Sequence, residues 1–532
     1  MLQERRDPKT FWLGILQRNL LWLYITSLAF LGIRATNPPR LSIKAPPASE
    51  FSTERAIQPL KIIASHPHPL GSAAHDSVRD FLLGKWKELG FSPEMQQAKI
   101  VDINGNEAQV SNIIVRLRGS VSPKAVMIVA HYDSTDRSPG AADDGAGIAV
   151  MLETGRALKS SSPLKNDIIF LMTDGEEQGC LGAKLFVREH TWAKDVGVVL
   201  NLEARGSSGL AIMFESSDGN AQLINDFIKS VPFPFASSLA PAIYERMPYT
   251  GDMSVFKSAG IQGLNFAFIA KSFIHSPKDT LDNLDLRSIQ HMGTSALALV
   301  RYLGSISLPE KSPQDAIFFN IFGSFIVSYP EWVSMLCIVL LGAMLVTAGV
   351  AGLRRKTIQS EKIALGILIY SGNIVLFICL ASFFPKTGAR IIAIGISYLM
   401  IRFSVSKLSR LQQAFSSSVI WTLLAASTAI ALPKGSYLFV WPAFFSFIPL
   451  FWRLRFRENP TPTWKDVLSV MLGITPVILL FAPSLYIFFT ALRPHLLVVQ
   501  VSAGIAAQIF WCTLPALKSK RTISVEGLPN IL

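Results

Sequence analysis

From about residue 327 onward the sequence consists of apolar stretches separated by short polar loops, and this pattern constrains the fold more than any other feature. A helix needs about 20 apolar residues to cross the hydrocarbon core of a membrane. Seven stretches approach that length, at about 330–353, 362–384, 389–404, 414–432, 436–452, 467–491 and 495–516. Another apolar run, 19–33, follows a basic leader and favours an uncleaved signal anchor. The sequence therefore predicts a polytopic membrane protein.

Basic residues gather in alternate loops between these stretches. The basic loops hold Arg354, Arg355, Lys356 and Lys362, then Lys407 and Arg410, then Arg453, Arg455, Arg457 and Lys465, and finally Lys518, Lys520 and Arg521. The intervening loops hold only Lys386 with Arg390, then Lys434, then Arg493. Because basic loops stay on the cytoplasmic side, this alternation predicts eight spans with both termini cytoplasmic. Residues 41–326 are then exoplasmic, which means periplasmic in a bacterium and lumenal in a eukaryote.

The charge distribution separates the middle of the chain from the rest. Residues 41–310 carry 25 Lys and Arg against 29 Asp and Glu, whereas the remainder carries 25 against 8. The basic excess thus accompanies the apolar segments, so the expected partner is the lipid bilayer and not nucleic acid. We expect a leader and anchor at 1–35, a linker at 36–50, a catalytic domain at 51–310, about seven helices at 327–517, and a cytoplasmic tail at 518–532.

The middle segment alternates buried strands with helical patterns. Strands are predicted at 125–130, 167–172, 197–202, 210–214 and 261–268, and helices at 81–89, 147–158, 181–189, 221–231 and 288–303. Such alternation predicts an α/β fold with three layers and a mostly parallel central sheet. The all-α membrane region follows it.

Imidazole and carboxylate groups follow most of these strands. They are His131, Asp133, Asp143, Asp144, Glu176, Glu177, Glu203 and His275. Ligands collect beyond the carboxyl ends of strands in open α/β sheets, so we expect these groups to meet at one edge. So many acidic groups together would raise one another's pKa unless cations neutralise them. Mixed imidazole and carboxylate ligation suits Zn²⁺, and the set is large enough for a pair of ions.

The same residues carry a resemblance to a known family. The motifs are His131-Tyr-Asp133, Gly140-Ala-Ala-Asp143-Asp144-Gly-Ala-Gly147, Asp174-Gly-Glu176-Glu177, Asn201-Leu-Glu203 and His275-Ser-Pro-Lys-Asp279. In order and spacing they resemble the clan MH di-zinc aminopeptidases (metallopeptidase family twenty-eight) over roughly residues 55–305. The segment from His66 to Leu82 resembles the membrane-bound branch of that family. The fold implied is the zinc-aminopeptidase-like domain.

The resemblance also implies roles for individual residues. Two zinc ions would be bridged by Asp143, with His131 and Glu203 completing one site and Glu177 and His275 the other. Glu176 would be the general base that activates a zinc-bridging water. Asp133 would orient His131. The implied activity is hydrolysis of the N-terminal bond of a peptide substrate.

Several interpretations stay open beside this one. A glutaminyl-cyclase-like enzyme would need a single zinc, and an inactive membrane receptor or transport subunit would need no catalysis. Family members use a tyrosine to stabilise the developing oxyanion, for which Tyr249 is the candidate. His66, His68 and His75 lie close in sequence, but the prolines at 67 and 69 splay the cluster, so we expect no metal there. We expect the membrane helices to act as an anchor or a platform for partners.

Overall fold

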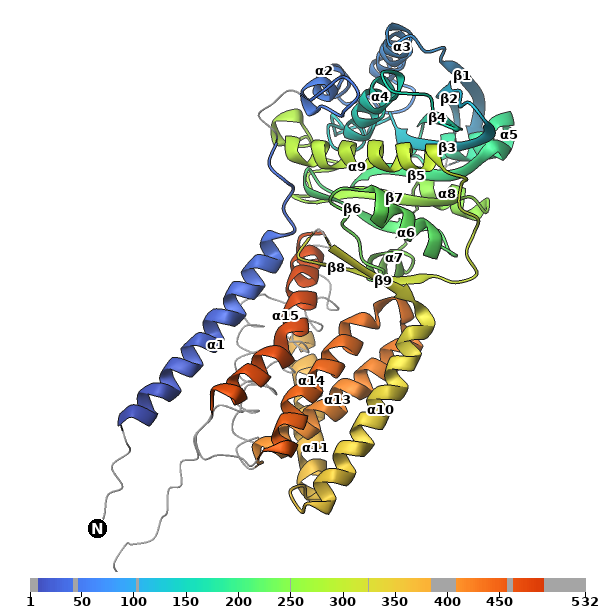
Figure 1. Ribbon diagram of the computed structural model, residues 1–532. Coiled ribbons are helices and arrows are strands. Elements are labelled where there is room, and N and C mark those ends of the chain that lie inside the picture. The colour runs from blue at the N-terminus through green and yellow to red at the C-terminus, as the bar shows by residue number, and fades with distance from the viewer. Residues whose placement is uncertain are drawn as a thin grey trace, which may run out of the picture.

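The computed structural model describes residues 8–41, 46–101, 105–248, 250–323, 325–383, 408–456 and 463–491. An α/β domain lies at one end of the molecule and a group of long helices at the other (Figure 1). The sequence prediction of an α/β domain followed by an all-α membrane region is confirmed.

A seven-stranded mixed sheet forms the centre of the α/β domain. Its order is β1-β2-β4-β3-β5-β7-β6, and the four inner strands β4, β3, β5 and β7 run parallel, whereas the remaining neighbours pair antiparallel. The strands are β1 (Glu94–Val101), β2 (Glu107–Leu117), β3 (Ser122–His131), β4 (Asn166–Thr173), β5 (Val196–Ala204), β6 (Ser208–Ser216) and β7 (Gln262–Ala270). All five predicted strands are present, and the parallel centre places the carboxyl ends of four of them at one edge.

Helices cover both faces of this sheet, which makes three layers. Alternate residues of β3 point to opposite faces of the sheet. Val126 and Ile128 pack in the core beneath α2, α3, α4 and α9. Met127 and Val129 pack in the core beneath α5 and α8. The helices are α2 (Thr53–Ile63), α3 (Ala73–Glu88), α4 (Gly145–Lys159), α5 (Leu181–Glu189), α6 (Ala221–Ser230), α7 (Leu239–Tyr244), α8 (Asp252–Ser258) and α9 (Leu286–Ser305).

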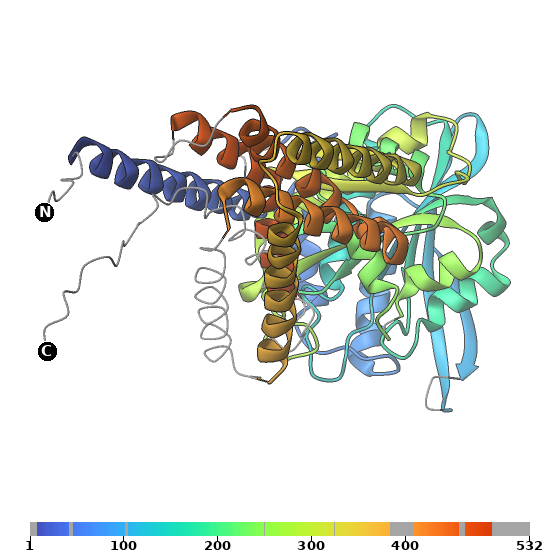
Figure 2. The ribbon, with the colours of Figure 1, turned by 90° about the horizontal axis from the view of Figure 1, so that it is seen from below.

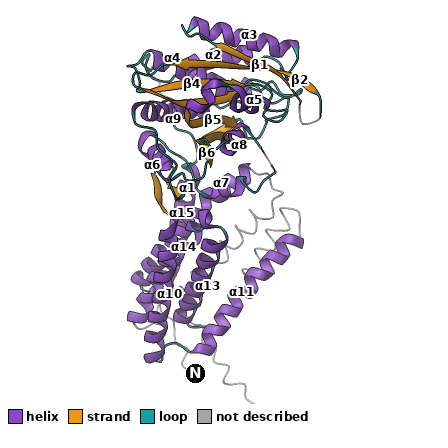
Figure 3. Cartoon of the chain, turned by 90° about the vertical axis from the view of Figure 1, so that its right-hand side faces the viewer, coloured by secondary structure: helices purple, strands orange, loops and turns teal. Residues whose placement is uncertain are grey.

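A hairpin connects this domain to the long helices. It consists of β8 (Ala316–Ile321) and β9 (Phe325–Pro330), and β9 runs directly into the first helix of the membrane region. Figure 3 shows this helix group below the sheet. The long helices are α1 (Pro8–Arg34), α10 (Glu331–Arg354), α11 (Ser360–Phe383), α13 (Arg410–Ala431), α14 (Tyr437–Arg455) and α15 (Trp464–Ala491), with a single 3-10 turn η3 (Pro433–Gly435) between α13 and α14.

Four of the described helices are long and apolar enough to cross a membrane: α10, α13, α14 and, over Trp464–Ile487, α15. The predicted apolar segments 19–33 and 362–384 also lie in helices, α1 and α11, but these two helices are not among those four. The predicted spans at 389–404 and 495–516 lie outside the described residues. Seen from below, α1 extends past the α/β domain on the side of its N-terminus (Figure 2).

The described basic helix ends lie together. α10 leaves the α/β domain and ends at Arg354, and α14 also leaves it and ends at Arg455, whose neighbour Leu454 accepts a hydrogen bond from Arg355. The η3 turn with Lys434 lies at the opposite end, against the domain. Within the described residues, the loop that begins at Arg354 and the end of α14 at Arg455 thus lie at one end of the helix group, and Lys434 lies at the other.

Candidate active site

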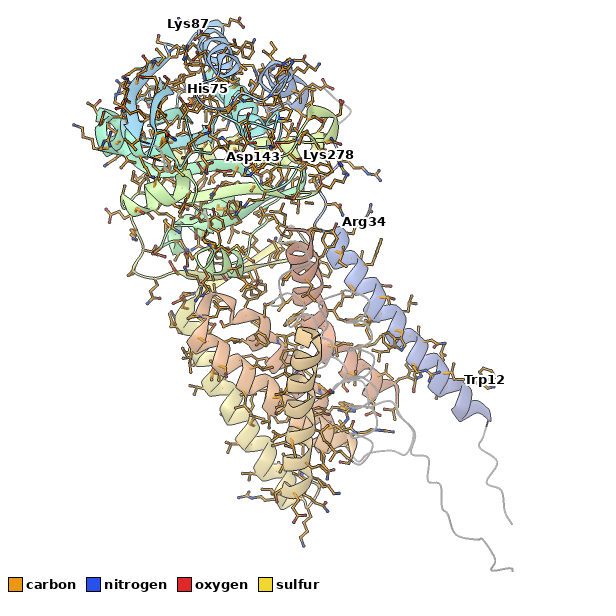
Figure 4. All side chains as sticks on the ribbon, turned by 180° about the vertical axis from the view of Figure 1, so that it is seen from behind. Trp12, Arg34, His75, Lys87, Asp143 and Lys278 are labelled. Atoms are coloured by element: carbon orange, nitrogen blue, oxygen red, sulfur yellow. The ribbon has the colours of Figure 1, made fainter. Side chains whose placement is uncertain are left out.

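The carboxyl edge of the parallel strands brings the predicted site residues together. His131 is the last residue of β3, and Glu176 and Glu177 follow the end of β4. Glu203 is the next-to-last residue of β5, and His275 is in the loop after β7. Figure 4 labels Asp143 inside the α/β domain, remote from the long helices.

Among the described residues, two groups of side chains are close enough to hold a metal ion. One is His131, Asp143 and Glu203, and the other is Asp143, Glu177 and His275; within each group the ligand atoms lie within 4.8 Å of one another. Asp143 belongs to both, because its Oδ1 lies 3.4 Å from His131 Nε2 and its Oδ2 lies 3.1 Å from His275 Nε2. Its two oxygens thus face two different imidazoles.

Asp133 connects the first histidine to the acidic loop. Its backbone carbonyl accepts a hydrogen bond from His131 Nδ1 at 2.9 Å, which leaves Nε2 to face Asp143. Its carboxylate accepts the backbone N–H groups of Glu176 at 3.1 Å and of Glu177 at 3.2 Å. The buried carboxylate of Asp133 therefore fixes the loop that carries both glutamates, and the backbone carbonyl of the same residue orients the imidazole of His131.

Two more carboxylates shape the backbone around Asp143. Asp144 caps α4 by accepting the N–H of Gly147, and it also accepts the N–H of His131. Asp279 accepts the N–H groups of Ala142 at 2.8 Å and of Asp143 at 3.2 Å. The sequence analysis assigned Asp279 no role, although it belongs to the His275 motif. The structure shows that it ties that motif to the Asp143 turn.

The electrostatics show how much negative charge the pocket concentrates. Burial, together with the nearby Asp143 carboxylate, raises the pKa of Glu203 to about 8. Burial and Glu203 raise the pKa of Glu176 well above its usual range. Hydrogen bonds to Asp143 and Glu177 raise the pKa of His275 to about 10. Glu176 and Glu203 therefore hold a proton more readily than an exposed glutamate does, and His275 holds one more readily than a free imidazole.

The donor set fits zinc. Each group supplies one imidazole nitrogen and carboxylate oxygens, which is the ligand chemistry of Zn²⁺ in proteins. A divalent ion at each group would replace the protons that otherwise compensate the carboxylates. The residues that would hold the metal are thus the five predicted from the sequence.

A tyrosine from α7 borders the same space. A Cβ atom on Gly251 would lie 3.5 Å from Glu176 Oε1, 3.7 Å from Glu203 Oε1 and 3.9 Å from the hydroxyl of Tyr244. The guanidinium of Arg205 lies 5.6 Å from the centre of the Tyr244 ring. Sequence reasoning missed this tyrosine and named Tyr249, which lies outside the described residues.

The histidines of the N-terminal segment differ from the expectation in one respect. His75 has an acidic partner distant in sequence, because its Nε2 lies 2.7 Å from Asp174 Oδ1, and both side chains are buried. The other Asp174 oxygen accepts the N–H of Ser111. The pair joins α3 to the start of the Glu176–Glu177 loop, so His75 has an acidic partner that the sequence analysis did not anticipate.

Part of the α/β domain matches a known protein family. Residues 112–300 match the model of peptidase family M28. Endoplasmic reticulum metallopeptidase 1 of Rattus norvegicus is 31% identical over 260 residues, 47% of this chain and 28% of the relative. The vacuolar membrane protease of Candida dubliniensis is 30% identical over 284 residues, 51% of this chain and 30% of the relative. The matched region thus spans less than a third of either relative.

Solved structures of low identity match about half of this chain. A Zn-dependent exopeptidase from Parabacteroides distasonis is 19% identical with a TM-score of 0.41, covering 48% of this chain and 99% of the other. A glutaminyl cyclase from Porphyromonas gingivalis is 20% identical with a TM-score of 0.39, covering 48% and 98%. The family match and the curated relatives confirm the resemblance seen in the motifs, and they show a peptidase family M28 domain over residues 112–300.

Proposed function

We propose that this chain is a membrane-anchored zinc metallopeptidase that acts as an aminopeptidase on peptides. The observation that carries the proposal is the position of Asp143, whose two carboxylate oxygens face His131 and His275 in two separate donor groups. The family match and the metallopeptidase and membrane-protease names of the relatives support hydrolysis at this site. The preference for N-terminal residues rests on the resemblance of the motifs to those of the di-zinc aminopeptidases.

The metal would bind at the two donor groups. When bound there, two zinc ions supply Lewis-acid polarisation of the scissile carbonyl and make a water molecule easier to deprotonate. His131, Asp143 and Glu203 would hold one ion, and Asp143, Glu177 and His275 the other.

Glu176 is the proton carrier in this proposal. It belongs to neither donor group, yet its Oε1 and that of Glu203 both lie within 4 Å of the point where a Cβ on Gly251 would be. The carboxylate takes the proton of the attacking water and returns it to the leaving amine. A general base works best when its pKa is near the working pH, and burial raises the pKa of Glu176 in that direction.

Tyr244 stabilises the charge that develops on the substrate. Its hydroxyl lies 3.9 Å from the point where a Cβ on Gly251 would be, and Glu176 Oε1 lies 3.5 Å from that same point. Burial raises the pKa of this phenol above its usual value. The hydroxyl therefore keeps its proton and can donate a hydrogen bond to the carbonyl oxygen as that oxygen becomes negative.

The domain would face the exoplasmic side of the membrane. Support comes from the basic ends of α10 and α14, which lie at the end of the helix group away from the α/β domain. Because basic ends stay cytoplasmic, the domain is then periplasmic or lumenal.

Metal analysis and peptide cleavage by the purified full chain test the proposal. We expect two zinc equivalents, release of N-terminal residues from free peptides, and no cleavage of N-terminally blocked peptides. Glu176→Gln should lower kcat about 10²–10⁴-fold with the zinc content unchanged. Glu88→Gln, at an exposed position of α3, is the matched control and should have no effect.

Other outcomes would replace the proposal. A single zinc equivalent with cyclisation of N-terminal glutamine would indicate the glutaminyl-cyclase chemistry. Cuts only inside blocked peptides would indicate an endopeptidase. No turnover with zinc bound, together with identical behaviour of the Glu176→Gln variant, would leave a binding module.

A further inference from the structure

A single lysine from the membrane region reaches into the α/β domain. Lys434 lies in η3, between α13 and α14, and its side chain is only 16% exposed. Its Nζ lies 3.0 Å from Asp315, 3.5 Å from Glu245 and 3.7 Å from Asp218. One ammonium thus meets three carboxylates of the α/β domain and its hairpin linker.

Two contacts of Lys434 lie at the two ends of the short helix α7. The backbone carbonyl of Lys434 accepts a hydrogen bond from the hydroxyl of Ser238 at 2.5 Å, and Ser238 is the residue before α7. The ammonium reaches Glu245, the residue after α7. Lys434 therefore contacts both ends of a helix that is only six residues long.

Apolar contacts from the membrane region continue along α7. A Cβ atom on Gly435 would lie 2.9 Å from a methyl group of Leu239, so the turn and the first residue of α7 are in close contact. Ile487, near the end of α15, belongs to the same apolar cluster as Ala240 and Tyr244. Isolated helices of this length are unstable in water, so α7 depends on such packing.

The last residue of α7 is Tyr244, whose hydroxyl borders the catalytic space. Its ring packs edge-on against Phe214 with ring centres 5.0 Å apart, and Arg205 covers it. These contacts hold the ring within the α/β domain, while η3 and α15 contact the helix that carries it from the membrane side. A displacement of about 1 Å in a catalytic group can cost about 10²-fold in rate.

We propose that Lys434 is a positioning residue: the membrane region holds α7, through this lysine, so that Tyr244 projects into the active site. The inference rests on the proposed function, in which Tyr244 touches the substrate. The helix group is then more than an anchor, because a loop at the membrane surface sets the geometry of a group in the catalytic pocket.

Amide hydrogen exchange of the full chain in a detergent micelle or nanodisc tests the contact without any assay of activity. In Lys434→Met we expect faster exchange in residues 239–248, with the strands of the sheet unchanged. Lys434→Arg should restore slow exchange, since it keeps the charge. The control Lys465→Met removes an exposed lysine at the opposite end of the helix group and should change nothing in α7. Unchanged exchange in α7, or faster exchange throughout the domain, would overturn the proposal.

A double-mutant cycle tests the route to catalysis. We expect Lys434→Met to lower kcat about tenfold while KM changes less than about twofold, and to lower it no further in a Tyr244→Phe background. An equal loss in both backgrounds would show that Lys434 does not act through Tyr244. If no peptide is turned over at all, the proposed function fails while the exchange experiment still decides whether Lys434 holds α7.

Discussion

The two donor groups of the candidate metal centre share Asp143 but differ in their surroundings. His131 is 2% exposed and belongs to the end of a central strand, and Asp133 holds it in one orientation. The side chain of His275 is 53% exposed and comes from a loop. One group is thus continuous with the hydrophobic core, and the other opens to solvent.

This difference separates stability from access. A buried charged group whose partner is removed destabilises the fold, whereas an exposed ion pair contributes little because water screens it. Substrate must approach from the solvent side, so the group with His275 is the one it meets first. We therefore expect changes to the two groups to affect catalysis alike but folding differently.

The largest expected effect follows from the residue that the groups share. Asp143→Asn keeps the shape of the side chain but removes the charge that would serve two ions, so we expect zinc content below one equivalent and activity lowered by about 10³-fold or more. Metal analysis and a peptide assay measure both. Asp136→Asn, at an exposed position of the same loop, is the control. Full zinc loading in Asp143→Asn would show that the two groups do not depend on a common ligand.

The second prediction compares the two histidines directly. Each of His131→Ala and His275→Ala should lose about one zinc equivalent and most activity. In the chelated protein, His131→Ala should lower Tm by about 5 °C, because it leaves buried carboxylates without a partner, and His275→Ala by about 1 °C or less. Equal shifts in Tm would remove the distinction between a core-like and an open group.

A smaller effect is expected from Asp133. In Asp133→Asn the side chain can accept only one of the two N–H groups of Glu176 and Glu177, so the acidic loop shifts. We expect activity to fall about 10–100-fold, as for other residues that orient metal ligands. Steady-state kinetics at saturating zinc measure it. Wild-type kinetics would show that the loop is held by other contacts.

The next prediction probes the open side of the site. Gly251 has an extended backbone, with φ −135°, so alanine is allowed there. Its methyl group would lie between Glu176, Glu203 and Tyr244. We expect Gly251→Ala to lower kcat/KM about tenfold with Tm and zinc content unchanged, because the methyl group occupies substrate space. A variant with unchanged kcat/KM would show that substrate does not enter between these three residues.

The sequence predicted the inner part of the sheet well, and the reason is physical. The parallel strands are buried on both faces and form continuous apolar runs, and the polar residues that end them meet at one edge by the geometry of parallel strands. The ligand assignment itself stays a prediction, although the structure brings the five residues together. The strand β1 was missed because it lies at the sheet edge and has the polar sequence EMQQAKIV.

Long-range contacts account for what the sequence left out. The helix α7 has only six residues, too few for a periodic pattern, and Tyr244 reaches the site because of how that helix packs. Helix α3 begins at Ala73, well before the predicted residue 81, because Ser72 caps it and its first turns are polar. The pairing of His75 with Asp174 joins residues 99 positions apart, which no local pattern reveals.

The smallest predicted effect uses another buried histidine, which shows that burial alone does not make a metal ligand. His291 on α9 accepts the N–H of Ala211 on Nδ1 and donates from Nε2 to the carbonyl of Phe233, so its ring is held neutral. Burial lowers the pKa of His291 to about 4. His131 is buried too, but its hydrogen-bond partners Asp133 and Asp143 outweigh the effect of burial and raise its pKa.

Since the folded protein binds this proton less readily than the unfolded chain, His291 destabilises the fold as pH falls below about 6.5, the usual pKa of histidine, and the loss levels off near pH 4. Between pH 7.5 and 5.5 we expect a loss of about 1.4 kcal/mol from this residue, one tenfold step in the folding equilibrium. Tm measured at the two pH values in the wild type and in His291→Gln isolates it, because every other titrating group is common to both proteins. The drop in Tm on acidification should be smaller in the variant by a few degrees. An equal drop in both proteins would mean that His291 binds a proton as readily in the folded protein as in the unfolded chain.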